Sequence, residues 1–177
     1  MWRKYQNIVI AFIAASLAVL VQFSLISAWP SFFNSINLIL IILIFSRFFL
    51  GRYDAVFVGL FAGFWLDFLS FHLFGVYLVA LFLSVLAADT VLRNWLTNRS
   101  LYSLLVLTVI VNLVYNFSFY LLLNVTRTEG RVFSLGQKSF WVSFGTELVW
   151  SLLAVLLLFN LAAALTKKMK PFFLENK

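Results

Sequence analysis

The chain has 177 residues, of which 64% are hydrophobic and only 11% are charged, and its formal net charge is +7. So few polar residues cannot cover the surface of a soluble domain of this size, which excludes an ordinary soluble fold. The absence of cysteine excludes disulfides, thiolate metal sites and a cysteine nucleophile. The basic residues lie at the ends of apolar runs, so membrane orientation and lipid headgroups explain the positive charge better than nucleic acid does.

Long apolar runs predict an all-α, polytopic membrane bundle that forms one integral-membrane domain over residues 1–177. A bilayer core of about 30 Å requires about 20 helical residues for each crossing. Six runs approach or exceed this length, at residues 8–28, 36–50, 55–70, 73–92, 101–125 and 140–165. The first run is long and lacks a clear small-residue cleavage site, so we interpret it as a retained transmembrane helix and not as a signal peptide.

The distribution of basic residues predicts that both termini are cytoplasmic. With six crossings and the amino terminus inside, 10 of the 13 lysines and arginines lie on the cytoplasmic side, and Arg127, Arg131 and Lys138 lie outside. The third run is shorter than a full crossing, and only a few residues separate it from the fourth. These two runs form either a tight helical hairpin or a re-entrant pair.

The third run carries an acidic residue at membrane depth. Gly59, Gly63 and Asp67 are spaced four apart, so a helix places two small residues and one carboxylate on a single face. Small residues at this spacing let helices approach closely, and a buried charge normally faces a bundle. Asp67 therefore either belongs to a packed, functionally important face, or reaches the headgroups or the free backbone donors of the following turn.

Two further acidic residues lie inside apolar runs. Asp89 precedes Arg93 by four positions, which predicts a local ion pair on the fourth helix. Glu147 belongs to a polar stripe with Ser143 and Ser151 on the sixth helix, and a charge there is expected to face other helices and not lipid.

The fifth run predicts a polar seam inside the bundle, which the Glu147 stripe is expected to face. Side chains able to form hydrogen bonds recur at intervals of four, at Asn112, Asn116, Tyr120 and Asn124. Such residues either hold helices together or line a small-molecule pocket, and the sequence leaves both readings open.

Motifs of catalysis are missing from the sequence. It contains no HExxH, GxSxG or Walker motif, and its one histidine, His72, has no second ligand at metal spacing. We therefore expect no enzymatic activity, no cofactor and no metal.

The segment 59–77 resembles the MreD family of small bacterial membrane proteins, in a chain whose length, spans and basic ends also fit that family. The matching residues are Gly59, Gly63, Asp67, Ser70, Gly75 and Tyr77. The chain departs from the family at Phe71 and Leu73, where the family often has glycine and proline, so the turn is expected to differ in shape.

The resemblance implies a multi-pass protein of the bacterial inner membrane, a non-enzymatic scaffold of the cell-shape or elongasome machinery. Such a scaffold binds an MreC-like bitopic membrane protein. Through this partner it contacts a RodA-like glycosyltransferase and a class B penicillin-binding protein, which carry out peptidoglycan synthesis for the cell wall.

A second class of protein stays open. Substrate-binding subunits of energy-coupling-factor vitamin transporters resemble this chain in size and six-helix plan, and often carry alanines four apart in the first helix, as Ala11 and Ala15 are here. A vitamin binder predicts a polar, aromatic-lined pocket that could use Asn116, Asn124 and Glu147, whereas a scaffold predicts an apolar groove for another helix.

Overall fold

The computed structural model describes residues 37–70, 73–95, 100–126 and 138–169, together with a few positions between 13 and 24. Every regular element in these ranges is helical. The elements are α2 (Leu38–Phe45), a π-helical segment (Ser46–Leu50), α3 (Arg52–Leu69), α4 (Val76–Asn94), α5 (Leu101–Thr126) and α6 (Lys138–Met169). The predicted first span and external loop lie mostly outside the described residues.

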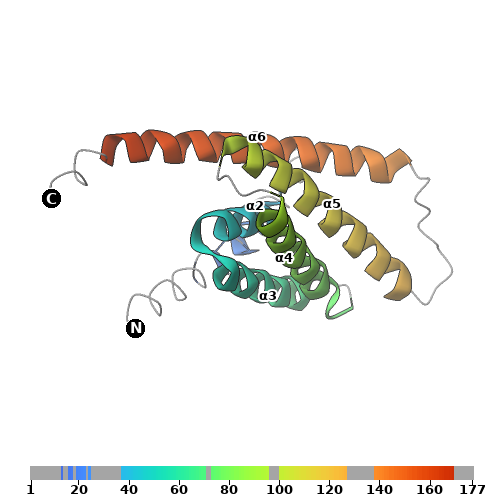
Figure 1. Ribbon diagram of the computed structural model, residues 1–177. Helices are drawn as coiled ribbons and strands as arrows, with labels where there is room; N and C mark the ends of the chain where they lie inside the picture. The colour runs from blue at the N-terminus through green and yellow to red at the C-terminus, as the bar shows by residue number, and fades with distance from the viewer. Residues whose placement is uncertain are drawn as a thin grey trace.

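Helix α2 is the centre of the bundle (Figure 1). It is apolar on every side, and five of its eight residues are buried, as expected for a helix surrounded by others. Its side chains Leu40, Leu43 and Ile44 are fully buried and join a core with residues of α3, α4, α5 and α6. The stretch Leu38–Leu50 rises about 20 Å, less than the thickness of a bilayer core.

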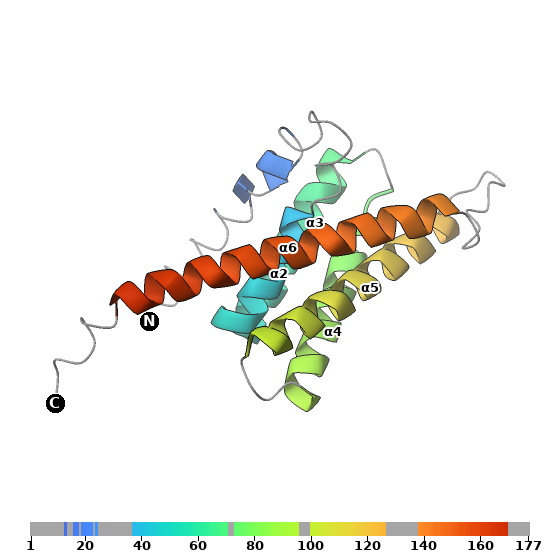
Figure 2. The ribbon, with the colours of Figure 1, turned by 90° about the horizontal axis from the view of Figure 1, so that it is seen from above.

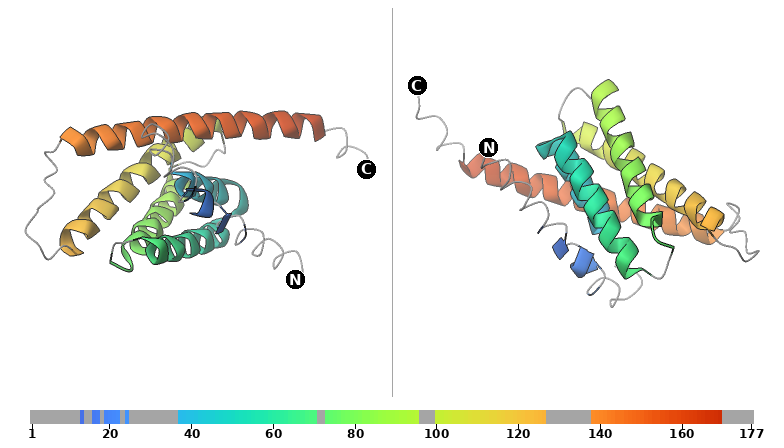
Figure 3. Two further views of the ribbon diagram at one scale, coloured as in Figure 1. Left: turned by 180° about the vertical axis from the view of Figure 1, so that it is seen from behind. Right: turned by 90° about the horizontal axis from the view of Figure 1, so that it is seen from below.

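Helices α3 and α4 form a tight hairpin and lie side by side along their length (Figure 3). They have 18 and 19 residues, so each rises about 28 Å. The third and fourth apolar runs therefore form a helical hairpin, and a full membrane crossing by both helices stays a prediction.

Helix α6 has 32 residues and crosses over α2 and α5 on one side of the bundle (Figure 2). Within residues 141–161, whose side chains are described, Ser151 and Val155 are the two buried positions. α6 therefore contacts the bundle along a narrow strip and leaves most of its apolar surface exposed.

Three helices of the described chain are long and apolar enough to cross a membrane: α4, α5 and α6. Helix α3 has the length but carries Arg52, Asp54 and Asp67. The three apolar helices mark the chain as a membrane protein, while six crossings with cytoplasmic termini stay a prediction.

Candidate functional site

The Asp67 carboxylate caps the first turn of α4 from the neighbouring helix. Its Oδ1 accepts a hydrogen bond from the backbone N–H of Tyr77 and its Oδ2 one from Leu78, both at 2.9 Å. Helix α4 begins at Val76 and its N-cap is Gly75, which has no side chain to satisfy these donors. Asp67 supplies the missing cap, and its negative charge faces the positive end of the α4 dipole.

The turn between α3 and α4 is shaped by two further residues of the segment. Gly75 has a φ of 106°, a left-handed conformation that favours glycine. The Ser70 hydroxyl donates to the backbone oxygen of Asp67 at 3.3 Å, just past the end of α3. On the other side of the turn, the Tyr77 ring packs against Phe119 of α5, with ring centroids 4.8 Å apart. The hairpin is thus joined to α5.

The glycine face of α3 packs against α4. A Cβ added to Gly63 would lie 2.7 Å from the Cα of Leu78 and 3.2 Å from its backbone nitrogen. A Cβ added to Gly59 would lie 2.7 Å from a methyl group of Val85, which is a side-chain contact. Gly63 is therefore needed for backbone-to-backbone contact, whereas the space at Gly59 depends on a side chain.

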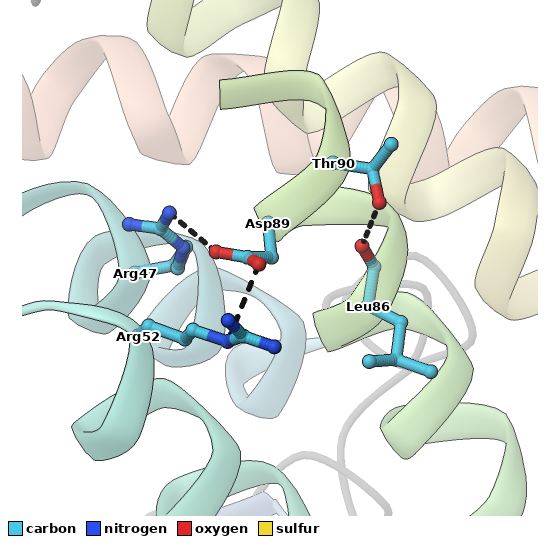
Figure 4. A network of polar contacts seen from close by, with 5 residues as sticks. All are labelled: Arg47, Arg52, Leu86, Asp89 and Thr90. Carbon is cyan, nitrogen blue, oxygen red and sulfur yellow. Dashed lines mark hydrogen bonds and ion pairs between the residues drawn. The ribbon is translucent and has the colours of Figure 1, made fainter. Parts of the chain in front are cut away.

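The opposite end of the hairpin is closed by ion pairs (Figure 4). Asp89 of α4 accepts from Arg47 at 2.6 Å and lies 3.3 Å from the Nε of Arg52, the first residue of α3. The prediction of a local pair with Arg93 is wrong: Arg93 is exposed, and the π-helical segment brings Arg47 to Asp89 from a different helix.

Glu147 of α6 meets side chains from α2 and α5. The amide of Asn37 donates to its Oε1 at 3.2 Å, and the Asn116 amide lies within hydrogen-bonding reach of the same carboxyl. We name Asn37, Asn116 and Glu147 the polar junction. Asn37 also caps α2, because its Oδ1 accepts from the N–H of Leu40 at 3.3 Å. The amino-terminal end of α2 therefore faces the carboxylate.

Sequence reasoning missed Asn37, although an asparagine directly before an apolar run is a helix-start signal. It predicted Asn116 and Glu147 as members of one seam, and the structure brings these two together.

The other residues predicted to form the seam or to face it differ in how deeply they are buried. Asn112 and Tyr120 are buried in the bundle, and Asn124 is partly buried. Ser143 is exposed, so it does not share the buried strip of α6 with Ser151. Residues spaced four apart on a helix rotate by about 40° at each step, so a long stripe leaves its original face.

The described residues contain no group of three or more His, Asp or Glu side chains that could hold a metal ion. Both oxygens of Asp67 are bonded to the chain's own backbone, and Asp89 and Glu147 also have partners within the protein. These three acidic groups therefore connect helices.

Compared with known protein families, curated proteins and solved structures, the chain matches none. Its function is therefore inferred from its own residues.

Proposed function

We propose that this protein is a non-enzymatic scaffold of the cell-wall elongation machinery in the bacterial inner membrane. In this proposal the α3–α4 hairpin docks the transmembrane helix of an MreC-like bitopic partner. That partner connects it to a RodA-like glycosyltransferase and a class B penicillin-binding protein, and so to cell shape and peptidoglycan synthesis.

The observation that carries the proposal is the pair of 2.9 Å hydrogen bonds from the α4 backbone to Asp67. These bonds occupy both carboxylate oxygens, so the acid that marks the resemblance fixes the shape of a hairpin. Each oxygen helps to hold the two helices together, which suits a scaffold that needs a rigid surface. The remaining residues of the resemblance, Gly59, Gly63, Ser70, Gly75 and Tyr77, also lie on this hairpin.

The same contacts indicate which face of the hairpin the partner would use. Gly59 and Gly63 are buried against α4, so their face is already occupied. The opposite side of α3, its outer face, exposes apolar and aromatic side chains at helical spacing. These are Tyr53, Phe57, Leu60, Phe64 and Phe68. We therefore assign partner docking to this outer face and bracing to the glycines.

The second candidate function, substrate binding for an energy-coupling-factor vitamin transporter, is favoured by one observation. The polar junction lies inside the bundle, and the aromatic ring of Tyr115 lies near it. A vitamin would have to displace the hydrogen bond that now joins Asn37 to Glu147, so we place this function second.

Affinity purification of the tagged protein from its native membrane, with identification of the proteins that accompany it, separates the two functions. The scaffold proposal predicts an MreC-like bitopic protein and wall-synthesis enzymes. Recovery of paired ATPase subunits with a bound vitamin would overturn it and establish the transporter.

A further inference from the structure

Two fully buried polar atoms, one on α5 and one on α6, have no hydrogen-bond partner among the described residues. They are the Oδ1 of Asn112 on α5 and the Oγ of Ser151 on α6, and both residues are 0% exposed. An unpaired polar atom in a bundle interior is costly, and native structures normally satisfy such atoms with protein or with ordered water. The pair therefore points to a ligand.

The register of the two helices places these atoms at the same level. α5 and α6 run in opposite directions where they cross (Figures 1 and 2), and Asn116 lies within hydrogen-bonding reach of Glu147. Asn112 lies four residues before Asn116, and Ser151 lies four residues after Glu147. Both are thus one helical turn from that contact, in the same direction along the interface.

The neighbouring amide donors are already engaged. The Asn112 amide donates to the backbone oxygen of Thr108 at 3.4 Å, and the Asn116 amide donates to that of Asn112 at 3.0 Å. The Oδ1 of Asn112 is an acceptor and needs a donor, while the Ser151 hydroxyl can donate or accept. A ligand that both donates and accepts matches this pair.

We propose that one ordered water molecule bridges Asn112 Oδ1 and Ser151 Oγ at the α5–α6 interface, next to the Glu147 carboxylate. Such a water donates to Asn112 and to Glu147 and accepts from Ser151, which gives it the three partners typical of buried water. A monovalent cation fits less well, because the Asn37 and Asn116 amides direct N–H groups at the same carboxylate. The site is independent of the proposed function. It places one water molecule in the contact between α6 and α5.

Water-edited solid-state NMR of the asparagine-labelled protein in lipid bilayers tests the site directly. Magnetisation is expected to pass from water to the buried Asn112 side chain, and Ser151→Val is expected to abolish this transfer. The matched control is Ser143→Val, an exposed serine of the same helix, which leaves the transfer unchanged. No transfer in the parent protein, or full transfer in Ser151→Val, would overturn the proposal.

Thermal unfolding provides a second test. Asn112→Leu and Ser151→Ala should each lower the Tm, and the double variant should lose less than the sum, because both changes remove the same bridge. A higher Tm for Asn112→Leu would show an atom without a partner and contradict the bridge. Replacing Na⁺ by choline should leave the Tm of the parent unchanged, whereas a lower Tm would identify a cation in place of water.

Discussion

Helices α3 and α4 pack backbone against backbone, and polar contacts join them at both ends. In contrast, α6 contacts the bundle along a narrow strip of side chains. At Gly63 the two hairpin helices leave no room for a Cβ, while Gly145 of α6 has no heavy atom within 4 Å of the same position. Two glycines in helices of one protein therefore have opposite roles. In lipid, where burial of apolar surface gives no drive for association, close packing and polar ties decide which helices hold firmly.

The largest effect is expected from matched leucine substitutions at these two glycines. Gly63→Leu should destabilise the protein by about 3 kcal/mol or more, because its Cβ would meet the α4 backbone. Gly145→Leu should change stability by no more than about 0.5 kcal/mol. Thermal unfolding of the detergent-purified proteins measures both. Equal stability of the two variants would refute the contrast between α3 and α6.

The ion pairs of Asp89, at the end of the hairpin far from the α3–α4 turn, should show the next effect. Asp89→Ala leaves Arg47, whose side chain is only 14% exposed, without a carboxylate, and should cost about 3 kcal/mol. Arg52→Ala removes a partner that is 54% exposed and should cost less than about 1 kcal/mol. The same unfolding assay checks the order, and a larger loss for Arg52→Ala would contradict it.

Removal of the Asp67 cap, beside the α3–α4 turn, should have an intermediate effect. Asp67→Ala leaves the N–H groups of Tyr77 and Leu78 without their acceptor, at a cost of about 2 kcal/mol. Asp67→Asn keeps one carbonyl acceptor and should recover part of the loss. Hydrogen exchange of the first turn of α4 should rise in Asp67→Ala, and unchanged exchange there would argue against a capping role.

The polar junction should show the smallest effect, since the contact between Asn37 and Glu147 is one part-buried hydrogen bond of 3.2 Å. Glu147→Gln keeps an oxygen for the Asn37 amide but removes the charge, which should cost about 1 kcal/mol. Ser143→Ala, on the exposed side of the same helix, should cost nothing measurable. If Ser143→Ala were as damaging as Glu147→Gln, Ser143 would belong to the junction after all.

Sequence reasoning succeeded where the information is local. The spacing of Gly59, Gly63 and Asp67 predicts one helix face, because helical periodicity alone decides it. The sequence also allows Asp67 to reach free backbone donors of the following turn, and the structure shows this contact. The turn is short, so the donors of α4 lie just beyond it.

The sequence did not predict contacts that depend on which helices become neighbours. Arg47 lies 42 residues from Asp89, whereas the rejected partner Arg93 lies four residues away, and spacing favours the nearer residue. The prediction that Ser143 shares a face with Ser151 is wrong for a geometric reason. Over the eight residues between them, an α-helix turns about 80° away from the starting face.

In the proposed function the hairpin, and not α6, presents the surface for a bitopic partner. The most direct measurement is the amount of that partner recovered from native membranes per unit of folded protein, for Asp67→Ala and Glu147→Gln side by side. We predict a several-fold loss for Asp67→Ala and recovery at the parental level for Glu147→Gln. Equal recovery by both variants, or a loss confined to Glu147→Gln, would contradict the claim.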